Sequence, residues 1–213
     1  MGKTCLLGRI IVGTFEKYGS TVGGDMYKKN IKLDQSYSLQ IVFHDTSGNK
    51  RYQALLGVSI RNANLAIIAY DVNCQKSFDQ IPDWRHKILE PNPNCKIVIV
   101  GTKIDLRENK TFNGISTKKG RALADLLNCN FCEVSSKTGS NIDEFLGILT
   151  KILMENDIGG GNGGSGVKME ALVSKGSHSL HSKKKSKSVL PLLPFISIVN
   201  TNGKVRVGSL QRG

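Results

Sequence analysis

The sequence predicts an α/β protein with a doubly wound, mostly parallel sheet. Residues 65–70 and 96–100 are short, continuous apolar runs bounded by polar residues, a pattern typical of strands buried on both faces. Between them, residues 77–89 place apolar side chains at helical spacing. Strands that alternate with helices indicate right-handed βαβ crossovers, and ligand-binding loops in such sheets gather at the carboxyl ends of the strands.

The other elements follow from the same patterns in chain order. Residues 5–12 have the mixed apolar pattern of a helix packed on a sheet, and this helix should end near Gly13. The remaining expected elements are strands at 30–35 and 38–43, a loop at 44–50 followed by a helix-like stretch, a helix at 117–127, a strand at 131–134 and a helix at 141–154.

Composition indicates one domain with a tail. The chain has 213 residues and a net charge of +13, and residues 159–213 hold nine basic residues against one acidic residue. We therefore expect a domain at residues 1–158 and a flexible tail at 159–213, first glycine-rich and then basic. The five cysteines are an odd number, which favours reduced thiols and a cytoplasmic protein, or one peripheral on intracellular membranes. The basic tail predicts weak contact with acidic membranes and no specific nucleic-acid binding.

The chain begins with a phosphate-binding signature. Gly2, Lys3 and Thr4 match the last three positions of the P-loop pattern G-x-x-x-x-G-K-[ST], which normally follows a strand. The earlier positions and that strand are absent, so we expect a P-loop NTPase-type sheet that lacks its first strand in an N-terminally truncated chain.

Three further motifs follow predicted strands. Asp45 and Gly48 form a D-x-x-G after the strand at 38–43; the carboxylate suits Mg²⁺, and the glycine lets its N–H approach a terminal phosphate. The strand at 96–100 leads into Thr102, Lys103 and Asp105, whose carboxylate can accept two parallel N–H bonds from guanine. The last motif, after the strand at 131–134, is Ser135, Ser136 and Lys137, which could close over the base.

These motifs, in this order, resemble the small GTPases of the Ras superfamily from Gly2 to about Met154. The resemblance rests on G-K-T, on Thr21 in the following loop, and on the D-T-S-G, T-K-I-D and S-S-K segments. Residues 70–78 look like Rab signatures, whereas G-K-T-C-L-L and G-T-K-I-D-L-R look like Rho. The extra helix that Rho proteins carry has no room between Asp105 and Ser135, so a Rab-like protein is favoured.

The resemblance implies specific roles for residues of this chain. Lys3 would pair with the β- and γ-phosphates, Thr4 and Thr21 would ligate Mg²⁺, Asp45 would hold the metal's water, and Gly48 would touch the γ-phosphate. Phe15 is a candidate to lie against the guanine and Tyr18 to cover the phosphates, with ordinary core packing as the alternative for both. The implied nucleotide contacts are Gly2, Lys3, Thr4, Cys5, Phe15, Tyr18, Thr21, Gly48, Thr102, Lys103, Asp105, Ser135, Ser136 and Lys137.

The implied function is a GTP/GDP switch with Mg²⁺ in vesicle trafficking or signalling. Lys3, Thr21 and Asn49 would be the catalytic residues, but Asn49 replaces the glutamine that orients the attacking water and is one methylene shorter. Hydrolysis should therefore be slow unless a partner supplies the missing group. Effectors, exchange factors and activating proteins would bind at residues 18–27 and 48–58. The last cysteine is Cys132, so no prenyl anchor is expected.

The missing first strand leaves three alternatives open. In this fold it lies between the strands at 38–43 and 65–70, where its absence would expose unpaired backbone groups. The chain is then an incomplete product of a longer gene, a degenerate GTPase-like interaction module with impaired nucleotide binding, or a rewired fold. In the third alternative residues 195–199, which have strand composition, reach back through the glycine-rich linker into the empty position.

Overall fold

A six-stranded sheet with the order β1-β2-β6-β3-β4-β5 forms the centre of the computed structural model. The structure describes residues 2–18, 25–32, 38–46, 57, 59–158 and 195–200. The strands are β1 (Asp25–Lys32), β2 (Ser38–Asp45), β3 (Leu65–Asp71), β4 (Lys96–Thr102), β5 (Asn130–Val134) and β6 (Phe195–Asn200). The helices are α1 (Lys3–Val12), α3 (Gln75–Asp79), α4 (Ile81–Leu89), α5 (Thr117–Leu126) and α6 (Ile142–Ile158), with a 3₁₀ turn, η2, at Ile104–Glu108.

Four of these strands run in one direction. β3, β4 and β5 are mutually parallel, and β6 is antiparallel to both β2 and β3, so β2 has the same direction as β3. β1 is antiparallel to β2. The predicted α/β fold is confirmed, with β3, β4 and β5 as the parallel part of the sheet. The pairings of β1 with β2 and of β6 with β2 and β3 are antiparallel.

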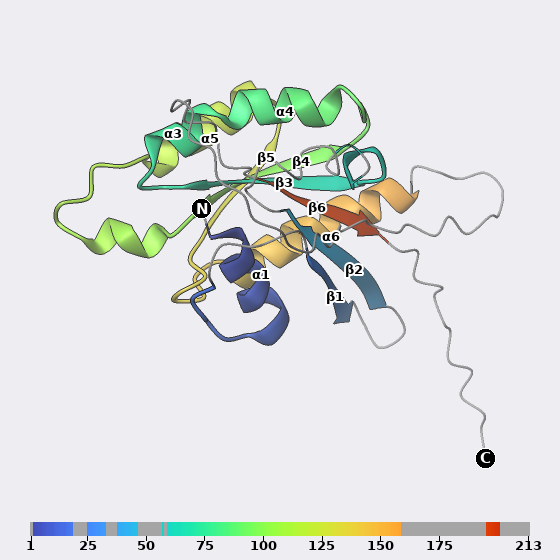
Figure 1. Ribbon diagram of the computed structural model, residues 1–213, viewed down its shortest axis with the longest axis horizontal. Coiled ribbons are helices and arrows are strands. Elements are labelled where there is room, and N and C mark those ends of the chain that lie inside the picture. Colours follow the sequence, from blue (N-terminus) through green and yellow to red (C-terminus); the bar gives the residue numbers. More distant parts are fainter. Residues whose placement is uncertain are drawn as a thin grey trace, which may run out of the picture.

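β6 lies in the sheet position that the sequence analysis left without a strand. It pairs with β2 from Ile41–Asn200 to Asp45–Ile196, and with β3 from Leu65–Ile198 to Ile68–Phe195. This pairing confirms the rewired alternative, which predicted a strand at residues 195–199 in this position; the observed strand ends one residue later. These residues belong to the segment expected to be a flexible tail, and they instead form the strand that joins the two halves of the sheet (Figure 1).

Helices cover both faces of the sheet, and each face has its own core. α1 and α6 pack on one face, around buried residues that include Leu7, Phe43 and Phe145. α3, α4 and α5 lie on the other face, where Tyr70 and Trp84 are among the buried residues. Figure 1 shows the two layers above and below the sheet. None of the helices in the described ranges is long and apolar enough to cross a membrane.

The helix α1 forms where the sequence predicts it. Leu6, Leu7 and Ile10 are buried at helical spacing. Gly2 precedes the helix with a φ of 78° and Gly13 ends it with a φ of 84°. Both values lie in the left-handed region that glycine adopts without strain, so the glycines define both ends of the helix.

Two predicted elements differ from the structure. The strand predicted at 30–35 is instead β1, Asp25–Lys32, because alternate residues Tyr27, Lys29 and Ile31 are half-buried although one of them is a lysine. The helix predicted at 77–89 is two helices, α3 and α4, separated at Gln80. A proline in the first turn of α4 explains the break, because proline lacks the N–H that a continuous helix requires.

Candidate functional site

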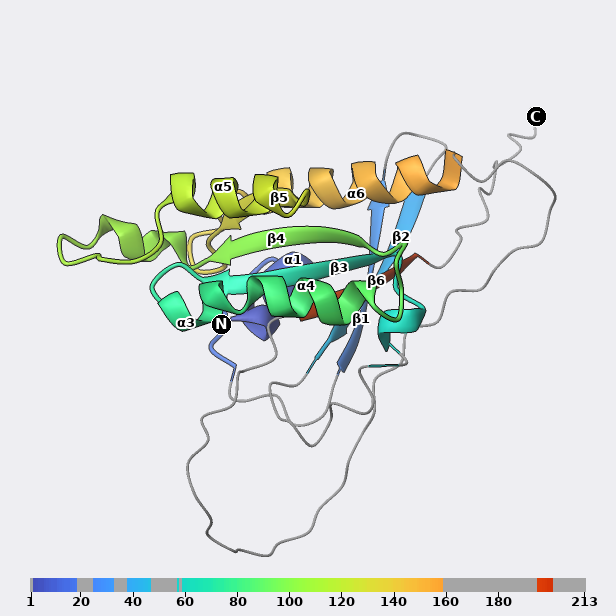
Figure 2. The same ribbon diagram turned by 90° about the horizontal axis from the view of Figure 1, so that it is seen from above.

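The carboxyl ends of β2, β3, β4 and β5 lie along one edge of the sheet, because these strands share a direction. The amino end of α1 reaches the same edge, since a Cβ atom placed on Gly2 would lie 3.8 Å from Cε of Lys103. In Figure 2 the arrow of β4 points toward the side of the molecule where the N-terminal end lies. The predicted ligand-binding edge is therefore assembled from four strands and one helix.

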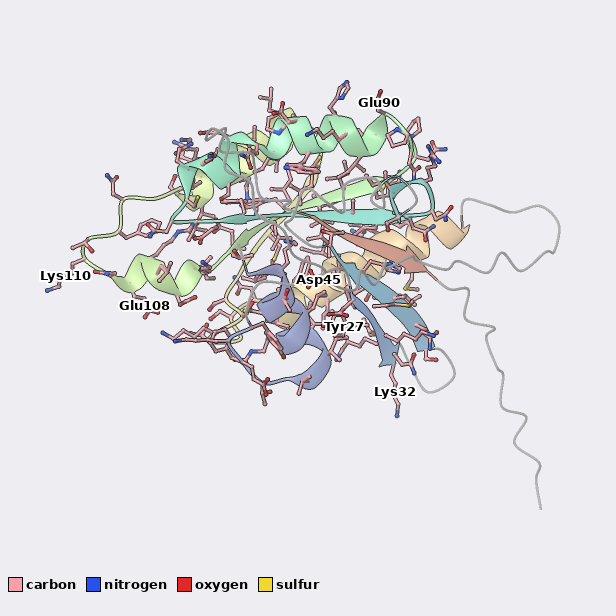
Figure 3. All side chains as sticks on the ribbon, in the orientation of Figure 1. Tyr27, Lys32, Asp45, Glu90, Glu108 and Lys110 are labelled. Carbon is pink, nitrogen blue, oxygen red and sulfur yellow. The ribbon has the colours of Figure 1, made fainter. Side chains whose placement is uncertain are left out.

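Thr4 and Asp45 meet at this edge. The Thr4 hydroxyl donates a 2.5 Å hydrogen bond to Oδ2 of Asp45, a buried residue at the end of β2. Figure 3 shows Asp45 beside α1. Hydroxyl and carboxylate oxygens are the ligands that Mg²⁺ prefers, so these two residues fit a divalent metal bound in this position.

Lys3 lies next to this pair. Burial lowers the pKa of its ammonium below the usual value, although the charge of Asp45 acts in the opposite direction. The first turn of α1 contains no acidic residue, and the free N–H groups of a helix amino end carry partial positive charge. The segment from Gly2 to Thr4 therefore presents N–H groups suited to phosphate oxygens, and a phosphate bound beside Lys3 would favour the charged form of its side chain.

Asp105 is held by the loop that follows β5. The hydroxyl of Ser135 donates a 2.5 Å hydrogen bond to Oδ1 of Asp105, so the motifs after β4 and β5 lie together as predicted. Lys103 forms an ion pair with Asp71 at the end of β3, with 2.5 Å between Nζ and Oδ2. Thr102 is buried, and its hydroxyl donates to the Tyr70 carbonyl.

Arg9 ties α1 to the same loop. Its guanidinium donates to the carbonyl oxygens of Ser136 and Lys137, each at 2.8 Å, and to that of Gly13 at 2.7 Å. The S-S-K segment is thus fixed to the helix whose other end carries Lys3 and Thr4. The two ends of the candidate site are connected through one arginine side chain.

Six further candidates remain, and the structure describes three of them. Tyr18 packs against the middle of α1, where a Cβ atom on Gly8 would lie 2.7 Å from its hydroxyl oxygen. Phe15 and Cys5 are half-buried. The predicted roles of these three residues in nucleotide contact stay predictions. Thr21, Gly48 and Asn49 lie outside the described residues, as do most residues of the expected partner-binding segments 18–27 and 48–58.

A polar network supports the segment that carries Asp105. Arg107 donates two hydrogen bonds of 2.6 Å to the two carboxylate oxygens of Glu133. The hydroxyl of Thr117 donates to the Glu133 carboxylate at 2.7 Å, and the hydroxyl of Tyr70 donates to the same carboxylate at 3.3 Å. Burial on its own would raise the pKa of Glu133, but the hydrogen bonds from Arg107 and Thr117 and the arginine charge hold that pKa below its usual value.

Asp71, Arg9, Arg107 and Glu133 are not among the predicted site residues, although Asp71 and Arg107 lie within quoted motifs. Asp71 had a usable signal, because it directly follows the apolar run of a predicted parallel strand. The signal for Arg9 was weaker: it is a cation in the last turn of a helix that ends at glycine. Arg107 and Glu133 are 26 residues apart, and no local pattern predicts their pairing.

Comparisons with known proteins agree with the motifs. The profile of the Ras family matches residues 1–155. The chain is 31% identical to the Ras-related protein Rab-24 of Dictyostelium discoideum over 142 residues, which cover 67% of this chain and 70% of the relative. It is 31% identical to human Ras-related protein Rab-30 over 73% of this chain and 76% of the relative. With the Ras-related protein Rab7 of Pisum sativum it shares 35% identity over 71% and 76%, respectively.

Proposed function

The chain belongs to the Ras family and is a Rab-like small GTPase of the Ras superfamily, and from this premise we propose that it binds GTP and GDP with Mg²⁺ and acts as a nucleotide-dependent switch in vesicle trafficking or signalling. The observation that carries the proposal is the contact between Thr4 and Asp45 at the amino end of α1. It lies on the same sheet edge as the contact between Asp105 and Ser135. One edge thus offers groups for phosphate, metal and base.

The phosphate end uses residues of α1 and β2. Lys3 would pair with the β- and γ-phosphates, and Thr4 would ligate the metal directly while Asp45 orients a water on it. When bound, Mg²⁺ neutralises phosphate charge. Thr21 would add a second hydroxyl to the metal and Gly48 would contact the γ-phosphate. Gly2 and Cys5 complete the proposed phosphate contacts.

The base end uses the loops after β4 and β5. Asp105 would accept two N–H bonds from the Watson–Crick edge of guanine, with Ser135 holding the carboxylate in place. Ser136 and Lys137 would close over the base together with Thr102 and Lys103. Phe15 is the proposed contact for the guanine ring and Tyr18 the proposed cover for the phosphates.

Hydrolysis by this chain is proposed to be slow. Lys3, Thr21 and Asn49 are the proposed catalytic residues, and the short Asn49 side chain would orient the attacking water poorly. Residues 18–27 and 48–58 are the proposed surface for effectors, exchange factors and activating proteins. The basic residues 183–187 would add a weak attraction to acidic membranes.

Nucleotide titration tests the proposal. Labelled GDP and GTP are added to the purified chain with and without Mg²⁺, and to the variants Thr4→Val and Thr150→Val. Thr150 is the matched control, because its hydroxyl bonds only within α6 to the Leu146 carbonyl among the contacts described. We expect guanine-specific binding in the micromolar range or tighter, with a Mg²⁺ dependence that Thr4→Val removes and Thr150→Val keeps. Absence of saturable binding would overturn the proposal.

A second function is favoured by the direction of β6. A strand that leads directly into the G-K-T segment would run parallel to β2 and β3, whereas β6 is antiparallel to both. The strand at this position therefore does not deliver a phosphate-binding loop to α1. The alternative is a GTPase-like interaction module that binds partner proteins without a nucleotide cycle. Partner binding that is equal in the presence and absence of GTP would support this alternative.

A further inference from the structure

We propose that Arg107 and Glu133 are positioning residues that set base specificity by fixing Asp105 against Ser135. The inference deepens the proposed function and rests on it, because Asp105 is the group proposed to recognise guanine. Neither Arg107 nor Glu133 is proposed to touch the nucleotide.

The segment that carries Asp105 has limited core packing, in which Ile104 packs half-buried against the core. It is the 3₁₀ turn η2, in which no side chain is fully buried. A turn of this kind makes few apolar contacts, so burial alone does not determine its position. Other interactions must hold Asp105 in one place.

Arg107 supplies such an interaction from within η2. Its two terminal nitrogens each donate a 2.6 Å hydrogen bond to a different carboxylate oxygen of Glu133. This paired geometry fixes orientation as well as distance, because the guanidinium and the carboxylate are both planar. Arg107 Nη2 also donates to the Ile115 carbonyl at 2.8 Å, which joins η2 to the loop before α5.

Glu133 is a rigid anchor for this arginine. Its side chain is only 7% exposed, against 23% for Arg107, and it lies on β5, the edge strand that pairs with β4. Thr117 at the start of α5 and Tyr70 on β3 also donate to its carboxylate. Three elements therefore hold Glu133, and through it they hold η2.

The Arg107–Glu133 ion pair and the Ser135–Asp105 hydrogen bond are neighbouring contacts between η2 and the segment formed by β5 and the loop after it. Arg107 follows Asp105 by two residues, and Glu133 precedes Ser135 by two residues. The Arg107–Glu133 ion pair is thus close in sequence, on both segments, to the 2.5 Å hydrogen bond from Ser135 to Asp105. If the Arg107–Glu133 ion pair is lost, η2 can shift relative to β5, and the Asp105 carboxylate loses its alignment with the base.

The test compares GDP with IDP, whose hypoxanthine base lacks the 2-amino group of guanine. Affinities are measured for the chain and for Arg107→Met, Arg107→Lys, Glu133→Gln and Arg121→Met. Arg121 is the matched control, an exposed arginine of α5 that stacks on Phe131 and makes no contact with η2 among those described. The preference is the dissociation constant for IDP divided by that for GDP. We expect this ratio to fall about tenfold in Arg107→Met and Glu133→Gln. Arg107→Lys should be intermediate, and Arg121→Met unchanged.

A role in stability alone would lower the midpoint of unfolding without changing this preference, and that result would overturn the inference. Amide hydrogen exchange in the absence of nucleotide provides a second readout. The amides of Leu106 and Asn109 are hydrogen bonded within the η2 region, and they should exchange faster in Arg107→Met and Arg107→Lys than in Arg121→Met. Unchanged exchange would overturn the inference even if no variant binds nucleotide. Faster exchange in a chain that binds no GDP would reject the proposed function and retain the positioning role.

Discussion

Glu133 shows how a carboxylate can be buried in this fold and remain ionised. Burial of a charge is costly, and removal of one partner of a buried pair leaves the other charge uncompensated. Glu133 receives hydrogen bonds from Arg107, Thr117 and Tyr70, and these outweigh the effect of burial on its pKa. The ionised form is therefore the one that the fold stabilises.

The stability of the protein should depend on pH through this residue. The pKa of Glu133 is lowered in the folded state, so its stabilising contribution is present above the unfolded pKa of about 4.3 and is lost as pH falls through the folded pKa. Glu133→Gln should lower the free energy of unfolding by roughly 1–3 kcal/mol at pH 7. Urea unfolding of both proteins at pH 7 and near pH 3.5 measures the difference, which should shrink at the lower pH. A difference of equal size at both pH values would contradict this account.

At the residue scale, most of the candidate site was predictable from local patterns. Asp45, Asp105 and Ser135 follow predicted strands, and Thr4 directly precedes a predicted helix; the structure brings these four residues into two contacts at one sheet edge. The supporting residue Arg9 was not predicted, because its contacts to Ser136 and Lys137 join positions 127 and 128 residues apart. A motif identifies the groups that contact a ligand, whereas the groups that hold them depend on tertiary packing.

At the scale of elements, β6 is the strand on which the continuity of the sheet depends. It pairs over five residues with β2 and over four with β3. Without these pairings, β2 would keep only β1 as a neighbour and β3 only β4, and the backbone groups on the sides that face β6 would lack sheet partners. β6 therefore contributes to stability through its backbone, whatever its side chains contact.

A proline in β6 should break this connection. Ser197 lies opposite His44 on one side and Ala66 on the other. Ser197→Pro removes its N–H from the ladder, and we expect a loss of roughly 1–3 kcal/mol in the free energy of unfolding for the unsatisfied partner alone. Ser197→Thr is the matched control, because threonine keeps the N–H and favours strands. Equal urea midpoints for the two variants would show that β6 does not pair as described.

The elements that differ from prediction have identifiable causes. β1 begins at Asp25 rather than at residue 30 because lysine stems can lie along a half-buried strand face, as Lys29 does when its ammonium donates to the Ile10 carbonyl. The position of β6 had a local signal in its strand composition, but its direction had none. The direction of β6 is known only from its pairing with β2 and β3, which are distant in the sequence.

At the scale of the whole molecule, the sheet joins segments separated by a long linker. β6 follows α6 by 36 residues, counted from 159 to 194. Because β6 is paired on both sides, the covalent linker is not the only connection between β6 and the rest of the sheet. The association should therefore survive a cut in the backbone.

Cleavage of the linker tests this expectation. A protease site is inserted between Gly161 and Asn162, and the purified chain is cut and passed over a gel-filtration column. We expect both pieces to elute together in native buffer, because the strand pairing holds them together, and to separate in urea. Cutting the linker makes the association of β6 intermolecular, and this weakens it by an entropic cost. Loss of the small piece in native buffer would show that β6 is held only by its tether. The uncut chain, which must elute at the same volume, is the control.

The position of β6 also has a consequence for biosynthesis. Asn200 pairs with Ile41, and Phe195 pairs with Ile68. A nascent chain therefore presents β2 and β3 well before their shared neighbour has left the ribosome. Contacts between such distant positions form slowly, and unpaired strands invite association with other chains during the delay. This small GTPase should consequently depend more on chaperones during synthesis than a relative whose central strands are made consecutively.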